Sequence, residues 1–200
     1  MNVSFTLSPK RQKREIEIFE AALSVFAEYG FRKAGIEDIA GRLEIAPATL
    51  YRYARDKRDL YRKAVEYAFE AWQDAALAAA AEVRDPVGRF RTLCRAAFEH
   101  LGREPRLRRI LAADPALFPV ADAEDPYSSI NERSRRLLER TIEEGVEAGA
   151  FAAPDPRAAS ILLFSLYRLF IDKAYVEEEA DEAALFEKAL DLVLDGLRAR

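Results

Sequence analysis

Residues 36–53, IEDIAGRLEIAPATLYRY, decide the fold of this chain. Ile36, Ile39 and Leu43 are spaced as the apolar face of a two-turn helix. After a short gap, Pro47 begins a second short helix, because the missing N–H of proline is harmless at the first helical position. Two short helices joined by a tight turn predict a helix-turn-helix unit.

The second of these helices is expected to expose its first residues. If Leu50 packs inward against the first helix, a step of about 100° per residue puts Arg52 on the opposite face. The small residues Pro47 and Ala48 would let the helix backbone come close to a DNA major groove, which is about 12 Å wide. An ordinary helical hairpin with a solvated arginine is the alternative interpretation of this spacing.

The rest of the chain also predicts helix, since no stretch alternates with the period of a strand. The fold class is therefore all-α, with about nine helices. A small helix-turn-helix head at 1–63 is joined to a larger helical body at 64–200. The helices expected outside the helix-turn-helix cover 10–29, 57–83, 86–102, 127–148, 155–175 and 181–197, with a short helix and loops between 103 and 127.

Composition narrows the class of protein further. Half of the 200 residues are hydrophobic and a third are charged, which is typical of a globular chain. No apolar run reaches the ~18 residues that a membrane span needs. The one cysteine, Cys94, suits the cytoplasm, and with one histidine, His100, we expect no metal site, no cofactor and no enzymatic activity.

Charge is distributed unevenly along the chain, whose net charge is −4. Residues 1–63 hold 13 Lys and Arg against 9 Asp and Glu, whereas the remainder holds 18 against 26. A basic head on an acidic body favours one orientation on DNA. The basic residues Lys10, Arg11, Lys13 and Arg14 could follow the DNA backbone or enter the minor groove, or they form a solubilising tail.

The stretch FEAALSVFAEYGFRKAGIEDIAGRLEIAPATLYRYARDKRDLY, residues 19–61, resembles the N-terminal domain of TetR-family transcriptional regulators. The matching elements are residues 26–31, Ile39-Ala40, residues 49–51, Tyr53, Lys57 and Leu60. The resemblance implies a dimeric repressor that binds a palindromic DNA operator. It also implies that a small ligand in a helical body, which is the dimerisation domain too, releases the operator.

Four positions depart from the family pattern. Glu44 stands where the turn usually has glycine, and Ala54 stands where phenylalanine is usual. Ala46 replaces a Ser or Thr cap, at a loss of about 1 kcal/mol of helix stability. Gly35 replaces a threonine that could contact phosphate. These departures leave the preferred operator sequence open.

The residues that match the family pattern indicate how the head would dock. Thr49, Tyr51, Tyr53 and Lys57 carry hydroxyls and an ammonium that suit phosphate contacts, which set register rather than read sequence. Arg52 is expected to contact a base, because its guanidinium can pair with guanine. The predicted DNA-binding set is Pro47, Ala48, Thr49, Tyr51, Arg52, Tyr53 and Lys57.

The last two expected helices predict how the chain pairs with a second copy. The helix from 155 is apolar nearly all round, so it needs partners on every side. Together with the last helix it would form a two-fold, four-helix interface, whereas the alternative is a fully packed monomer. The predicted interface residues are Leu162, Leu166, Phe170, Phe186, Leu190, Val193 and Leu197.

Aromatic side chains of the middle helices predict a ligand pocket in the body. An apolar or aromatic small molecule would suit such a lining, although simple core packing is the alternative for each residue. The predicted lining is Phe69, Trp72, Cys94, Phe98, Phe118, Tyr127, Phe164 and Tyr167. A helical dimer whose head binds a partner protein instead of DNA remains the alternative function.

Overall fold

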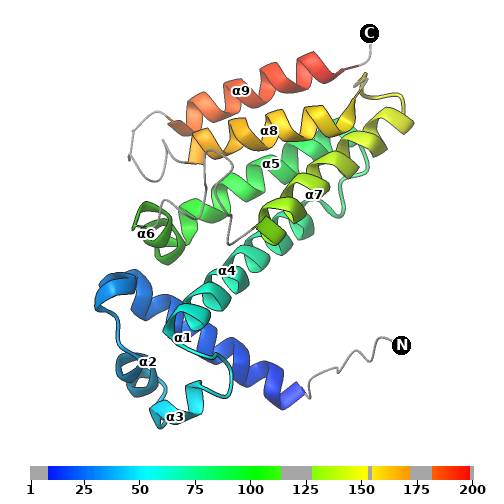
Figure 1. Cartoon of the computed structure of the whole chain (residues 1–200). Coiled ribbons are helices and arrows are strands. Elements are labelled where there is room, and N and C mark those ends of the chain that lie inside the picture. Colours follow the sequence, from blue (N-terminus) through cyan, green and yellow to red (C-terminus); the bar gives the residue numbers. More distant parts are fainter. Residues whose placement is uncertain (1–8, 114–127, 153–154, 172–181, 199–200) are drawn as a thin grey trace. The chain divides into compact units, whose positions relative to one another are not determined.

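The structure is a computed structural model that describes residues 9–113, 128–152, 155–171 and 182–198 (Figure 1). These residues form nine helices, and the expected all-α fold class is confirmed. No helix among them is long and apolar enough to cross a membrane. The helices are α1 Pro9–Lys33, α2 Ile36–Arg42, α3 Pro47–Leu50, α4 Lys57–Ala80, α5 Pro86–Arg103, α6 Pro105–Ala113, α7 Ser128–Glu147, α8 Pro156–Ile171 and α9 Glu182–Leu197.

The observed helix ends follow local chemistry. Gly30 adopts φ 74° and ψ 158° and interrupts the helical path of α1, as a C-terminal glycine does, before one more turn leads to Lys33. The carboxylate of Asp85 accepts a hydrogen bond from the N–H of Gly88 at 2.6 Å and caps α5. α4 ends at Ala80, three residues before the predicted end.

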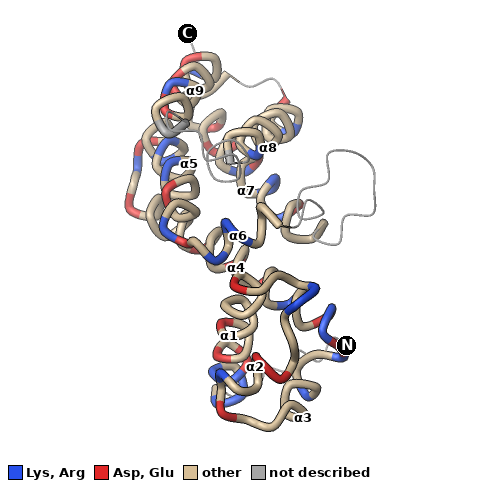
Figure 2. Tube along the Cα trace, turned by 90° about the vertical axis from the view of Figure 1, so that its left-hand side faces the viewer, with Lys and Arg blue, Asp and Glu red and all other residues tan. Residues whose placement is uncertain are grey.

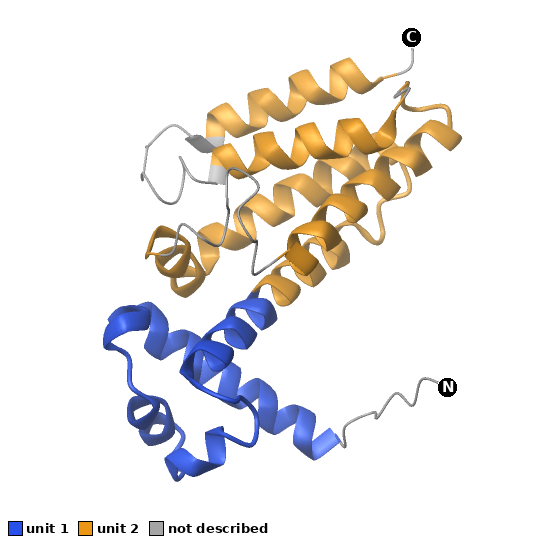
Figure 3. Cartoon of the chain, in the orientation of Figure 1, with its two compact units in different colours: residues 1–68 blue, residues 69–200 orange. Residues whose placement is uncertain are grey.

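The chain divides into two compact units, residues 1–68 and 69–200 (Figure 3). The division falls five residues after the predicted boundary at 63 and lies within α4, which contributes to both units. The N-terminal unit holds α1, α2, α3 and the first part of α4. The C-terminal unit holds the rest of α4 and α5 to α9.

The N-terminal unit is built around apolar residues at helical spacing on α1. Ile18 and Phe26 are buried there, together with Leu50 of α3 and Leu60 of α4. The Phe26 ring meets the Tyr61 ring edge to face, with 5.0 Å between the ring centroids. Burial of these side chains, at about 1.5–3 kcal/mol each, fixes the two short helices that could not form alone.

The turn between α2 and α3 contains a strained residue. Glu44 has φ +53°, a left-handed conformation that costs a residue with a Cβ about 1 kcal/mol. The turn is closed by backbone hydrogen bonds from Glu44 N to Gly41 O at 3.2 Å and from Ile45 N to Ala40 O at 3.0 Å. Glu44 thus occupies the conformation that the usual glycine of this turn would adopt without strain.

The C-terminal unit has a core rich in phenylalanine. Phe98 of α5 stacks on Phe186 of α9, with ring centroids 4.2 Å apart and planes 5° from parallel. Gly145 of α7 makes room for Phe151, whose ring lies 2.0 Å from the position that a Cβ would take. Because Phe151 also meets Phe90 edge to face, the loop after α7 is anchored to α5.

Candidate nucleic-acid interface and ligand cavity

The helix-turn-helix buries one side of α3 and exposes the other. Leu50 is buried, whereas Pro47, Ala48 and Arg52 are exposed and Tyr51 is 54% exposed. Thr49, Tyr53 and Lys57 are half-buried, so the seven predicted DNA-binding residues differ in their access to solvent. The exposed residues of α3 are small and uncharged, whereas the first exposed charged residue after the helix, Arg52, is basic.

α3 is a single turn that backbone hydrogen bonds hold tightly. Thr49 N donates to Ala46 O at 2.9 Å, Arg52 N to Thr49 O at 3.2 Å, and Tyr53 N to Leu50 O at 2.9 Å. No side chain caps the helix at Ala46, as expected for an alanine. The short i to i+3 pattern means that Arg52 lies in the turn that follows α3, not within the helix.

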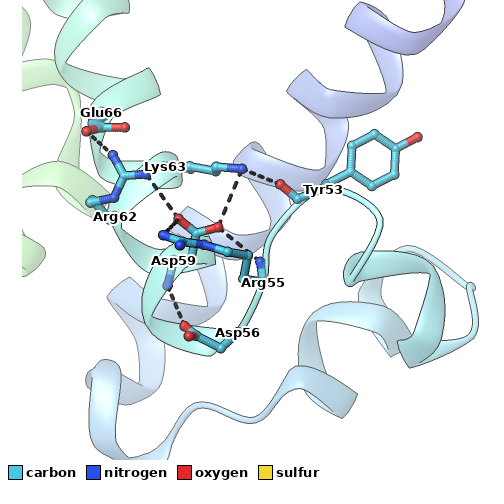
Figure 4. Close-up of polar contacts among 7 residues, drawn as sticks. All are labelled: Tyr53, Arg55, Asp56, Asp59, Arg62, Lys63 and Glu66. Atoms are coloured by element: carbon cyan, nitrogen blue, oxygen red, sulfur yellow. Dashed lines mark hydrogen bonds and ion pairs between the residues drawn. The ribbon is translucent and has the colours of Figure 1, made fainter.

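A buried carboxylate organises the segment that follows (Figure 4). The side chain of Asp59 is only 4% exposed, and its oxygens accept hydrogen bonds from Arg55 N and Arg62 Nη2, both at 3.0 Å. Lys63 Nζ lies 3.5 Å from the same carboxylate and donates to the carbonyl of Tyr53 at 2.6 Å. The network therefore ties the turn after α3 to the first turns of α4.

Half of a capping box is present at the start of α4. Asp59 N donates to Asp56 Oδ1 at 2.8 Å, so the side chain of Asp56 caps the helix. The carboxylate of Asp59 reaches back one residue further than in a capping box, to the N–H of Arg55. That hydrogen bond, supported by the Arg62 guanidinium, lowers the pKa of Asp59 from 3.8 to about 2, although burial opposes the change.

Lys57 makes contacts within its own unit. Its Nζ donates to the carbonyl of Arg32 at 3.3 Å and lies 4.9 Å from the centroid of the Phe31 ring. The ammonium thus joins the start of α4 to the end of α1. A phosphate contact by Lys57 would add to this structural role.

The basic residues at 10–14 lie in the first turns of α1 and do not form an extended arm. Lys10, Arg11 and Lys13 are exposed, and Arg14 pairs with Glu17 at 2.7 Å. Figure 2 shows basic residues around the start of α1 and none along α3.

The C-terminal unit contains a cavity of about 110 Å³ among α4, α5, α7, α8 and α9. Five of the predicted pocket residues line it: Phe69, Trp72, Cys94, Phe164 and Tyr167. Phe98 does not line it but packs behind, stacked on Phe186. Phe118 and Tyr127 lie outside the described residues. Burial raises the pKa of the Cys94 thiol to about 12, so this thiol is neutral and unreactive at pH 7.

Sequence reasoning missed the polar residues of the cavity. Gln73, Asn131 and Ser134 line it together with Arg168. Gln73 Nε2 donates to Ser134 Oγ at 2.7 Å and to the carbonyl of Ile130 at 3.2 Å. These partners are some sixty residues away in sequence, so no local pattern could have indicated that Gln73 is buried.

The predicted interface residues fall into two groups. Phe170, Phe186 and Leu190 are buried in the core of their own chain and also line the cavity. Leu166, Val193 and Leu197 are half-buried against that core, and Leu162 is 70% exposed. The large exposed apolar residues of α8 and α9 are Ile161, Leu162, Leu169, Leu185 and Leu192, of which Leu162 belongs to the predicted interface.

Comparison with known proteins agrees with this geometry. Residues 18–64 match the model of the bacterial regulatory proteins of the tetR family. None of the curated proteins matches the chain in sequence. The matched segment contains α2, α3 and the Asp59 network.

Several solved structures share the fold of the whole chain. A TetR transcription regulator from Haloarcula marismortui has a TM-score of 0.79 at 21% identity, over 94% of this chain and 99% of that one. The fatty acid degradation regulator FadR from Bacillus halodurans has a TM-score of 0.76 at 23% identity, over 92% and 99%. FadR from Bacillus subtilis in complex with stearoyl-CoA has a TM-score of 0.76 at 18% identity, again over 92% and 99%.

The N-terminal unit is thus a helix-turn-helix unit with a basic turn after its second helix, joined to an all-helical body. Through this unit the chain resembles the TetR family, and the fold of its described residues is that of solved TetR-family transcriptional regulators.

Proposed function

We propose that the chain is a dimeric DNA-binding transcriptional repressor that a small ligand in its C-terminal unit releases from a palindromic operator. The observation that carries this proposal is the match of residues 18–64 to the TetR family over a helix-turn-helix whose outer side is exposed. The division at 1–63 and 64–200 gives DNA binding to the first part and ligand binding and dimerisation to the second.

The exposed side of α3 suits a major groove. Pro47 and Ala48 are small, so the helix backbone can approach the base edges closely. Arg52, exposed in the next turn, would pair with a guanine, and Tyr51, also exposed, would donate to a phosphate. The Asp59 network holds this turn in one conformation, so little entropy would be lost on docking.

A second copy would cover the exposed apolar residues of α8 and α9. Leu162 and Leu169 are seven residues apart on α8, and Leu185 and Leu192 are seven apart on α9, so each pair lies on one side of its helix. Leu192 is 74% exposed and Leu162 is 70% exposed, and several exposed leucines on two helices suit a surface that a partner covers. A two-fold dimer would set the separation of its two heads, which must be about 34–36 Å to enter successive major grooves.

The C-terminal cavity is the proposed site of ligand control. A ligand that binds better when the heads are wrongly spaced would shift the population away from the DNA-bound state. FadR from Bacillus subtilis binds stearoyl-CoA on a similar fold. The cavity of this chain, about 110 Å³, is below the roughly 300–1,000 Å³ of larger ligand pockets, which favours a more compact ligand here.

Binding to random and selected DNA duplexes tests the DNA-binding role. We expect duplexes selected from a random pool to be palindromic and binding to weaken by orders of magnitude as salt rises. Arg52→Ala should relax the preference at one base pair by roughly 1–3 kcal/mol. Arg84→Ala removes an exposed arginine from the other unit and is the matched control. A chain that binds no duplex at low salt would instead favour a head that binds a partner protein.

Sedimentation of charged variants tests the proposed dimer. Leu162→Glu and Leu192→Glu should each shift the chain from dimer to monomer, because a carboxylate would be buried unpaired in the interface. Ile16→Glu puts the same charge on a 45%-exposed apolar residue of α1 and should leave the dimer intact. Unchanged sedimentation of both leucine variants would assign the interface to another surface.

A further inference from the structure

The cavity of the C-terminal unit is enclosed mainly by apolar side chains. Aromatic rings of Phe164, Phe170 and Phe186 line it, together with leucines of α5, α7 and α8. An apolar cavity of about 150 Å³ in another protein stays dry and binds benzene, so a volume of about 110 Å³ is on the scale of one small ring. This lining favours an uncharged molecule, because an ion would lose its hydration there.

One polar group of the lining has an unused atom. Gln73 is only 7% exposed, and both hydrogen bonds of its amide are made by Nε2, to Ile130 O and Ser134 Oγ. A carbonyl oxygen such as Ile130 O can only accept, which fixes the amide nitrogen on that side. The other amide atom, Gln73 Oε1, is buried and receives no hydrogen bond from the described residues.

A buried acceptor without a donor is a costly arrangement that proteins rarely keep. Oε1 needs a donor, such as a hydroxyl or an N–H, and it would repel a carboxylate or a phosphate. Arg168 also lines the cavity, but it is only half-buried and its guanidinium lies 5.9 Å from the Phe164 ring centroid. The Arg168 side chain is partly exposed and has interactions of its own, so Gln73 is the stronger determinant of ligand chemistry.

We infer that the cavity binds a compact, uncharged ring compound that donates one hydrogen bond to Gln73 Oε1, as a phenol or a cyclic alcohol would. This inference rests on the proposed ligand control for its regulatory meaning, but the binding itself does not depend on DNA. A neutral hydrogen bond of this kind changes affinity by about tenfold.

Calorimetric binding to the full chain without DNA tests the inference, with phenol, toluene and benzoate as probes. The fluorescence of Trp72, which lines the cavity, provides a second readout. In Gln73→Met, the affinity for phenol relative to toluene should fall about tenfold. Thr141→Val removes a buried hydroxyl of the same unit that does not line the cavity, so it should keep the original ratio.

Three outcomes would overturn the inference: an unchanged phenol-to-toluene ratio in Gln73→Met, tighter binding of benzoate than of phenol, or no binding of either neutral ring. If Gln73→Met does not fold, a crystal structure of the unaltered chain with phenol decides. The phenol oxygen should then lie within about 3.0 Å of Gln73 Oε1. A hydroxyl directed elsewhere would contradict the assignment.

DNA release is measured separately, so the two proposals can fail independently. Phenol binding through Gln73 without any effect on a selected duplex would leave the inference intact and contradict the ligand-released repressor. If the chain binds a duplex but no neutral ring compound binds in the cavity, the inference is contradicted and the ligand-released repressor remains intact.

Discussion

The two units differ in how completely a buried polar side chain is hydrogen-bonded. In the N-terminal unit, the Asp59 carboxylate accepts from Arg55 N and Arg62 and lies beside Lys63, so its oxygens are well satisfied. In the C-terminal unit, Gln73 uses its nitrogen and leaves its oxygen without a donor beside a cavity. The difference agrees with the proposal that the body accepts a further molecule, whereas the network in the head holds one conformation.

Removing the satisfied carboxylate should have the largest effect on stability. Asp59→Ala leaves the N–H of Arg55 and the guanidinium of Arg62 without their shared acceptor, so we expect the N-terminal unit to lose roughly 1–3 kcal/mol of unfolding free energy. Hydrogen exchange of the α1 and α2 amides would report the loss, while exchange in α7 and α8 should stay as before. Asp195→Ala, which changes an exposed pair with Arg198, is the control and should have little effect.

Acid should loosen the same unit first. The pKa of Asp59 is lowered in the folded chain to about 2, so its stabilisation is present above pH 4 and disappears as the pH falls from 4 towards 2. Exchange rates of the N-terminal unit should therefore rise over this interval, and Asp59→Asn should reduce that pH dependence. An equal pH dependence in the variant would mean that another carboxyl group controls acid unfolding.

Substitution of Gln73 in the C-terminal unit should change the unfolding free energy much less than Asp59→Ala does. Gln73→Met removes two hydrogen bonds but also the buried acceptor that no residue satisfies, so we expect the unfolding free energy to change by less than about 1 kcal/mol. Urea unfolding followed by Trp72 fluorescence reports this unit. A loss of unfolding free energy as large as that in Asp59→Ala would mean that the hydrogen bonds of Gln73 stabilise the C-terminal unit. The two units would then not differ in this respect.

Relief of backbone strain in the head should produce the smallest effect. Glu44→Gly removes the left-handed strain at φ +53° but increases the freedom of the unfolded chain, so we expect a net gain of about 0.5 kcal/mol. Glu44→Ala removes the same carboxylate without relieving the strain and should give no gain. Equal stability of both variants would show that the side chain, not the backbone, decides this position.

Local sequence patterns were enough for the helices and the helix-turn-helix. Leu50 is buried and Arg52 exposed as their spacing predicts, and Pro47 begins α3 as its missing N–H predicts. These features depend on helical period and on backbone chemistry within a few residues. The same reasoning gave five of the cavity residues, because large aromatic side chains on amphipathic helices tend to face the interior.

Two neighbouring apolar residues show that local sequence patterns do not predict which side of an apolar helix is buried. Leu185 and Phe186 are adjacent and both strongly apolar, yet Leu185 is 48% exposed and Phe186 is buried against Phe98. A helix that is apolar nearly all round has no hydrophobic face from which its orientation could be predicted. Only its packing against α5 decides which residues face the core and which remain for a second copy.

The sequence by itself determined an all-helical chain with a helix-turn-helix near its start, because helical period, proline and glycine act over a few residues. Tertiary structure alone decided that Asp59 is saturated with donors and that Gln73 keeps an unused acceptor at the edge of a cavity. Burial and hydrogen bonding of those two groups depend on how the helices pack, and for Gln73 the partners are some sixty residues away.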